Sequence, residues 1–209
     1  MIASNLAGDN WISRHFGFLW AFRRFRKSSG VEVDISKLLP TFLKKKVTDP
    51  LEYGYKAAMF YNDRKGWGQE EYGTNRFYLD APYGIVLSCS KDGGEAIPIA
   101  IISFKRKGLR TIRIEQIQGP SNCKEDRASD RVAALGKIKW ERLLVRIICE
   151  WARLNGLKRV EVISCVRSHW YQKFMHQSMF MRYDVTARRM GFTEIRSKKI
   201  YRLKLKTAT

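Results

Sequence analysis

The sequence predicts a mixed α/β fold organised around a strand-helix-strand crossover. An apolar strand pattern runs from Thr111 to Gly119, and a second runs from Arg159 to Cys165. Between them lies the strongest helical pattern of the chain, from about Lys137 to Asn155. Because such a connection joins parallel strands, we expect the two strands to form a parallel pair within a larger sheet. We expect ligands at the carboxyl ends of these strands.

The first 70 residues are expected to be mainly helical. One helix is predicted from about Trp11 to Lys27, and another begins near Pro40, since proline fits the first turn of a helix. A third is predicted from Asp49 to about Asn62, because a capping aspartate followed by a proline and an early acid is typical of a helix start. This helical part belongs to a single predicted domain over 1–209, whose sheet and crossover helices occupy 71–209.

The middle of the chain reads as an antiparallel meander. Strands are predicted at Arg76–Asp80, Gly84–Ser90 and Ile97–Lys105, and the turn Asp92-Gly93 between the last two favours a hairpin. The meander leads directly into the strand at Thr111. The predicted sheet is therefore mostly antiparallel and twisted, with a central parallel crossover.

Beyond Thr111 the pattern alternates between loop, helix and strand. A long polar loop is expected from Pro120 to Ala134. The helix that follows carries apolar residues at helical spacing, which predicts a buried face: Trp140, Leu143, Leu144, Ile147, Ile148 and Trp151. A helical region ending at Thr186–Phe192 and a strand at Lys199–Leu205 complete the predicted order.

Charge is the strongest compositional signal. The chain has 40 Lys and Arg against 20 Asp and Glu, a net charge of +20. Such a protein attracts polyanions such as DNA, RNA or anionic lipid, although a basic surface can also serve solubility alone. The candidate nucleic-acid residues are those of two basic clusters in the N-terminal part: Arg23, Arg24, Arg26, Lys27, Lys44, Lys45 and Lys46.

The cysteines are widely spaced and include no C-x-x-C pair, so no metal site is expected. Reduced cysteines predict a cytoplasmic protein. The apolar run Phe16–Phe22 is too short to span a membrane. His169 and His176 lie seven residues apart with no paired carboxylate nearby, which is a weak metal signal.

The order of elements resembles that of the GCN5-related N-acetyltransferase (GNAT) superfamily. The resemblance rests on Trp140–Leu144 in the crossover helix, on the helix-turn-strand step Asn155–Val162, and on Ala187–Phe192 before the last strand. It covers roughly Phe77 to Leu205. It implies a GNAT-like fold and acetyl-CoA as cosubstrate.

The resemblance also implies where acetyl-CoA binds. GNAT enzymes hold its pyrophosphate on backbone N–H groups at the start of the crossover helix, in a Gln/Arg-x-x-Gly-x-Gly/Ala loop. Here the matching stretch, 134–140, has one glycine, so the loop is altered. The residues implied as cofactor-binding are Ile117, Gln118, Gly119, Gly136, Lys137, Ile138, Lys139 and Ser164.

Three residues are candidates for proton transfer. Glu115 is the candidate base, at the level where several GNAT enzymes carry a catalytic glutamate; it could equally be a surface carboxylate paired with Arg113. Tyr183 and Tyr171 are candidate acids for the leaving thiolate, since the position of the family's usual tyrosine is Ala187. Either tyrosine could instead be a core or surface residue.

Two functions are consistent with the sequence. The first is an acyl-CoA-dependent N-acyltransferase that acetylates an amine on a polyanion-associated substrate, namely protein, RNA or DNA. The alternative is a non-catalytic nucleic-acid-binding protein on a GNAT-like scaffold, with aromatics such as Trp67 and Tyr72 among its basic segments.

Overall fold

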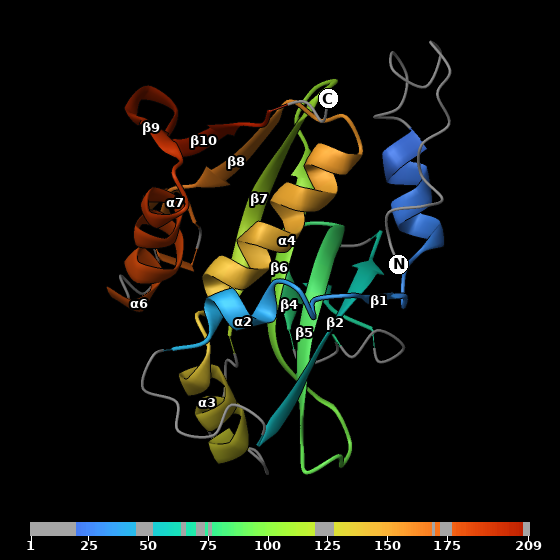
Figure 1. Ribbon diagram of the computed structural model, residues 1–209. Helices are drawn as coiled ribbons and strands as arrows, with labels where there is room; N and C mark the ends of the chain where they lie inside the picture. The colour runs from blue at the N-terminus through green and yellow to red at the C-terminus, as the bar shows by residue number, and fades with distance from the viewer. Residues whose placement is uncertain are drawn as a thin grey trace.

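The computed structural model describes residues 20–44, 52–63, 66–69, 74, 77–119, 128–168, 170–171 and 177–206. Within these residues the main sheet has 8 strands in the order β1-β2-β5-β6-β7-β8-β10-β9 (Figure 1). Along the chain these are β1 (Glu32–Val33), β2 (Tyr53–Tyr61), β5 (Tyr83–Lys91), β6 (Ile97–Arg106), β7 (Thr111–Gln118), β8 (Arg159–Ile163), β9 (Thr193–Ile195) and β10 (Ile200–Lys204). A separate two-stranded sheet joins β3 (Gly66–Trp67) to β4 (Tyr78–Leu79).

The predicted fold class is confirmed. Strands β7 and β8 run parallel, and helix α4 (Trp140–Leu154) crosses between them over one face of the sheet (Figure 1). Every other neighbouring pair in the main sheet is antiparallel within the described residues. The apolar residues predicted as the buried stripe of this helix lie in the main core.

Further helices and turns lie within the described residues. They include a helix over 20–27, α2 (Leu39–Phe42), α3 (Ala128–Lys137), α6 (Gln177–Phe180) and α7 (Thr186–Arg189), with a π-helical turn η3 (Met181–Val185) and 3-10 turns η2 (Cys165–Arg167) and η4 (Arg196–Lys198). The helix over 20–27 is the described end of the helix predicted from Trp11. Its Phe25 packs edge-on against Phe104 and Trp151, so it belongs to the same layer as α4.

The helix predicted from Asp49 to Asn62 is wrong in its described part. Residues Tyr53–Tyr61 form β2, which pairs with β5 along its whole length. Buried Tyr53, Tyr55 and Ala57 alternate with exposed Gly54 and Lys56. This two-residue period, stabilised by partners far away in the sequence, outweighs the local signals of a helix start.

The predicted helix start at Lys137 and the loop reaching Ala134 are also wrong. Residues Ala128–Lys137 form a separate helix, α3, and α4 begins only at Trp140. Of the two residues between them, Lys139 has a non-helical backbone (φ −90°, ψ 63°) and donates its N–H to the carbonyl of Phe42 at 2.8 Å. A bridge between Leu43 and Ile138 thus breaks the helix in two.

The two faces of the sheet differ in character. On the α4 side lies the main core, to which β7 contributes Ile112, Ile114 and Ile117. On the opposite side, a smaller apolar cluster forms where β4 packs on the sheet: Phe60, Phe77, Leu79, Val86 and Ile101. Beside that cluster the same side carries Lys105, Arg113, Glu115, Glu161 and Arg202. We call this part, on β6, β7, β8 and β10, the charged face.

Candidate functional site

The parallel strands β7 and β8 pair over only part of their length. Their register runs from Thr111↔Arg159 to Ile114↔Val162, whereas β7 continues to Gln118. Past Ile114, none of the described strands pairs with β7 on this side. A ligand with an extended, amide-bearing chain can add to such an edge as a strand does.

The strands part at a β-bulge in β7. Ser103 of β6 lies opposite Gln116, while the next residue, Phe104, lies opposite Ile114. Glu115 is therefore the extra residue of the bulge. A bulge bends its strand and re-aims the side chains around it. The residue predicted as the base thus lies where the two strands separate.

Tyr183 reaches into the gap from the turn η3. Its hydroxyl accepts a hydrogen bond from the backbone N–H of Ile117, at 3.1 Å. Tyr183 is buried, and this burial raises its pKa. The structure therefore places Tyr183 next to the predicted cleft, and its role as an acid stays a prediction.

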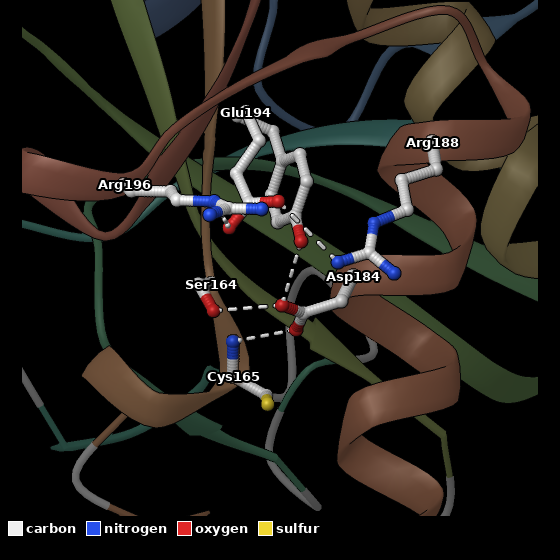
Figure 2. Close-up of polar contacts among 7 residues, drawn as sticks. Ser164, Cys165, Asp184, Arg188, Glu194 and Arg196 are labelled. Carbon is white, nitrogen blue, oxygen red and sulfur yellow. Dashed lines mark hydrogen bonds and ion pairs between the residues drawn. The ribbon is translucent and has the colours of Figure 1, made fainter.

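A buried carboxylate fixes the turn that carries Tyr183 (Figure 2). Asp184 accepts hydrogen bonds from the Ser164 hydroxyl at 2.7 Å, the Cys165 N–H at 2.8 Å and the Tyr201 hydroxyl at 3.0 Å. Burial and the bond to Asp184 raise the pKa of Tyr201 to about 12. These bonds tie η3 to the end of β8 and to β10, which positions Tyr183.

The same cluster includes Ser164, which was predicted to bind the cofactor. Its hydroxyl proton is donated to Asp184, so the described contact is structural, and a contact with a cofactor stays a prediction. Figure 2 also shows Arg188, Glu194 and Arg196 at the edge of the cluster. Their ion pairs, at 3.4 Å and 3.9 Å, are largely exposed, so they contribute little stability.

Glu115 lies on the charged face with two cations at its carboxylate. Its Oε1 is 2.7 Å from the Nε of Arg113 and 3.0 Å from the Nζ of Lys105. The alternative of a pairing with Arg113 is therefore what the structure shows. The pairing leaves the carboxylate only partly exposed at the bulge, and its role as a base stays a prediction.

Gln116 is a site residue that the sequence reasoning missed. Its Oε1 accepts hydrogen bonds from the Ser103 hydroxyl at 3.0 Å and the Asp80 N–H at 3.2 Å, while its Nε2 donates to the carbonyl of Tyr78 and to Gln118. These bonds anchor β4 beside the bulge. The signal in the sequence that could have identified Gln116 was a polar side chain within an apolar strand. Asp184, a carboxylate within a helix, gave a similar signal.

The first turn of α4 lies beyond the end of β7. A side chain on Gly119 would meet Trp140 at 3.5 Å and Leu135 at 3.7 Å, so these residues pack over the end of the strand. The guanidinium of Arg182 lies 5.8 Å from the centre of the Trp140 ring. The first turn of α4 therefore lies next to the end of β7.

Glu141 places a carboxylate in that first turn. Burial raises its pKa, and this outweighs the opposing effects of its own backbone N–H and of Arg182, Lys44 and Arg142. Three cations near a helix N-terminus form a setting that suits phosphate groups. Glu141 would compete with such an anion for the backbone N–H groups.

The residues predicted to form the phosphate loop precede this turn. Gly136 is exposed near the end of α3, Ile138 is buried, and Lys137 pairs with Glu52 at 3.4 Å. The loop geometry implied for 136–139 is therefore corrected, because the bridge to Leu43 holds these residues in place. Their contact with a cofactor stays a prediction, as it does for Ile117, Gln118 and Gly119 at the end of β7.

The remaining candidates lie elsewhere. Tyr171 is half-buried against the main core, and its role as an acid stays a prediction. Of the nucleic-acid candidates, Lys44 and the cations of the helix over 20–27 are exposed, and the guanidinium of Arg26 lies 4.4 Å from the ring centre of Tyr61. Lys45, Lys46, His169 and His176 lie outside the described residues.

Within the described residues, neither a metal site nor a membrane-spanning helix adds to these candidates. In the described part of the chain, no group of His, Cys, Asp and Glu is arranged to hold a metal ion. Among those residues, no helix is long and apolar enough to cross a bilayer. Cys149 and Cys165 are buried thiols, and burial raises the pKa of each to about 12.

Comparison with known proteins gives matches in structure only. No family model matches the chain, and no curated protein matches it. The solved structures include a cAMP-binding acyltransferase from Mycobacterium smegmatis, at 11% identity and a TM-score of 0.39 over 73% of this chain and 44% of that one. Another is nourseothricin acetyltransferase, at 14% identity and a TM-score of 0.33 over 74% of this chain and 99% of that one.

A third is N-acetylglutamate synthase from Neisseria gonorrhoeae, at 15% identity and a TM-score of 0.28 over 66% of this chain and 28% of that one. At these identities and TM-scores the matches carry no argument about this chain. The parallel crossover that the GNAT resemblance implies is present between β7 and β8, and the chemistry has to be argued from the chain's own geometry.

Proposed function

We propose that this protein is an acyl-CoA-dependent N-acyltransferase that transfers an acetyl group to an amine. The observation that carries the proposal is the separation of β7 from β8 at the Glu115 bulge. It leaves backbone groups of β7 facing a gap between two parallel strands. The pantetheine arm of CoA is an extended chain with two amides, which suits pairing along such an edge.

The residues around the gap fit the other end of CoA as well. Lys44, Arg142 and Arg182 lie near the first turn of α4, where backbone N–H groups and the helix dipole favour phosphate. Bound acetyl-CoA would supply the acyl group. Displacement of Glu141 from its own N–H would be needed for a phosphate to reach the helix start.

The chain's own residues can handle the protons of the reaction. As the amide bond forms and the carbon-sulfur bond breaks, the amine loses a proton and the sulfur gains one. Glu115 is positioned to orient the amine and receive its proton. Tyr183, whose hydroxyl lies at the N–H of Ile117, would donate its proton to the sulfur as the thiolate leaves, and the phenol would regain a proton from solvent.

Thermal unfolding with CoA tests the proposal. A ligand present at 100 times its dissociation constant stabilises the native state by about 2.7 kcal/mol, which raises the melting temperature by several degrees. We expect CoA and acetyl-CoA to produce such a shift. An unchanged melting temperature at millimolar CoA would contradict the proposal.

A variant of the bulge separates binding from chemistry. Glu115→Gln should retain the CoA-dependent shift and lose most acetyl transfer, because the amide cannot accept the amine proton. Glu32→Gln is the matched control, since that carboxylate is exposed on β1 and pairs with Lys56. Equal turnover in both variants would remove Glu115 from the mechanism.

The second candidate is a non-catalytic nucleic-acid-binding protein on the same scaffold. It is favoured by the net charge of +20 and by the exposed cations of the helix over 20–27. Binding of nucleic acid that weakens steeply with salt, in a protein that CoA does not stabilise, would favour this candidate.

The first proposal also includes three further predictions. They are an acceptor associated with a polyanion, a cytoplasmic location and a single domain over 1–209.

A further inference from the structure

The charged face gathers cations around the bulge. Lys105 lies opposite Arg113 in the register of β6 and β7, and both contact the carboxylate of Glu115. On the other side of Arg113, Glu161 of β8 is bound by Arg202 of β10 at 2.6 Å. Each of the two acids is thus already engaged with a cation.

Further cations crowd the same place. The positive charge of Arg113, followed by desolvation and the charge of Lys105, lowers the pKa of Lys107, and Arg167 adds to the effect. Arg113, Lys105 and Arg167 repel the charge of Lys107, and Glu115 acts in the opposite direction. An anion bound among them would relieve the repulsion. We call Lys105, Lys107, Arg113 and Arg167 the cation cluster.

Arg113 is placed to contact such an anion directly. Its side chain is only 8% exposed, and among the described residues its contact with Glu115 uses Nε. The remaining N–H groups of the guanidinium form a planar fork that matches a phosphate or carboxylate. The fork lies at the base of the charged face, beside the candidate base.

Three aromatic rings form a second feature, which we call the aromatic strip. The ring centres of Trp67 and Tyr78 are 6.0 Å apart, and those of Tyr78 and Trp170 are 5.8 Å apart. Trp67 is 65% exposed and Tyr78 is 37% exposed. Large aromatic side chains that stay this exposed are uncommon, and together they mark an interaction site.

Gln116 connects the aromatic strip to the cation cluster. It follows Glu115 in β7, and its side chain donates a hydrogen bond to the carbonyl of Tyr78. Tyr78 therefore lies one residue beyond the bulge, on the charged side of the sheet. The strip and the cluster lie on opposite sides of Glu115.

We propose that the aromatic strip and the cation cluster together bind a single-stranded nucleic acid. The exposed rings would stack on bases, and the cations would hold the phosphates that follow along the strand. This arrangement would carry an amine of the strand, or of a protein bound to it, to Glu115. That last step rests on the proposed acyl transfer, whereas the binding itself does not.

The pairing of features favours a single strand over other polyanions. An acidic peptide would use the cations and gain little from the exposed rings of Trp67 and Tyr78. A duplex hides the faces of its bases within the stack, so the rings could not reach them. Both are therefore comparison ligands in the test.

Fluorescence anisotropy on the full chain tests the binding. The probe is a labelled single strand of about 12 nucleotides, a length that spans one ordinary site. Single-stranded RNA and single-stranded DNA are run as separate arms, beside a duplex of the same sequence and a polyglutamate peptide. We expect either single strand to bind more tightly than the duplex or the peptide.

Two pairs of variants locate the site. Trp67→Ala should weaken binding of the single strand about tenfold, which is the usual effect of losing one stacked base. Trp20→Ala is its matched control, because Trp20 is 54% exposed on the helix over 20–27. Lys107→Ala should reduce the salt slope by about one, with little effect from Lys56→Ala, whose side chain is 60% exposed on β2. Equal losses within either pair, or preference for the duplex or peptide, would overturn the proposal.

This test is independent of acyl transfer, because no CoA is present. Single-strand binding that depends on Trp67, in a protein unmoved by CoA, would support the surface and contradict the proposed function. A CoA-dependent stabilisation with equal losses for Trp67→Ala and Trp20→Ala would do the reverse.

Discussion

The two faces of the central strands carry different kinds of side chain. In β7, Ile112 and Ile114 point into the main core, whereas Arg113 between them points to the charged face. One strand therefore contributes dry packing on one side and ion pairs beside exposed aromatics on the other. The comparison teaches that substitutions a few ångströms apart should separate cleanly into effects on stability and effects on binding.

The bulge connects the two faces. One extra residue at Glu115 keeps Gln116 on the side of β4, while Ile117 returns to the core side. The same residue ends the pairing with β8. The site therefore arises where the regular alternation of the strand is interrupted.

The largest expected effect is on the core side. Leu144 of α4 is fully buried in the main core, so Leu144→Ala should reduce the free energy of unfolding by about 2–5 kcal/mol. Urea unfolding measures the loss. Val132→Ala in α3 is the control, because Val132 is 56% exposed and its loss should be small. Similar losses in both variants would contradict the assignment of the core.

The next largest effect is expected at the hydrogen-bonded cluster around Asp184. Asp184→Asn replaces one acceptor oxygen with an amide donor that faces other donors, so it should cost about 1–3 kcal/mol of stability. It should also lower acetyl transfer, because the turn carrying Tyr183 is no longer fixed. Glu194→Gln, an exposed acid at the edge of the cluster, should change stability by less than about 0.5 kcal/mol. A stable Asp184→Asn would show that the cluster is not structural.

The third effect depends on pH. Burial raises the pKa of Glu141 in the native state above its ordinary value of 4.5. The native state therefore binds this proton more tightly than the unfolded state, and the stability so gained is lost as the pH rises through the native pKa. Glu141→Gln removes this loss. The free energy of unfolding of the Glu141→Gln variant, relative to that of the parent protein, should therefore rise with pH above 4.5. Parallel curves of unfolding free energy against pH for the two proteins would contradict the burial of this carboxylate.

The smallest expected effect on stability is at the aromatic strip. Trp67→Ala should change the free energy of unfolding by about 0.5 kcal/mol or less, because the ring is mostly exposed. Urea unfolding beside the Leu144→Ala variant gives the comparison directly. A loss as large as that of Leu144→Ala would make the strip a part of the core rather than a binding surface.

Prediction from the sequence succeeded where local pattern and tertiary structure agree. Helix α4 buries one stripe, and β5, β6 and β7 are nearly continuous buried runs, and both patterns are readable without knowing the partner. Glu115 was selected from its level in the strand, and the structure places it at the bulge. The error at β2 came from trusting cap signals over an alternation that needs β5 to stabilise it.

The sequence by itself determined the hairpin of β5 and β6, the parallel crossover and the excess of positive charge. Only the tertiary structure decided which of the positive side chains gather around Glu115. Gln116, Asp184 and the aromatic strip acquire their roles from contacts with residues distant in the chain, such as Tyr78 and Ser164. The reason is physical: a repeat of hydrophobicity is local, whereas a bulge, a buried carboxylate and a row of exposed rings are defined by the neighbours that folding brings to them.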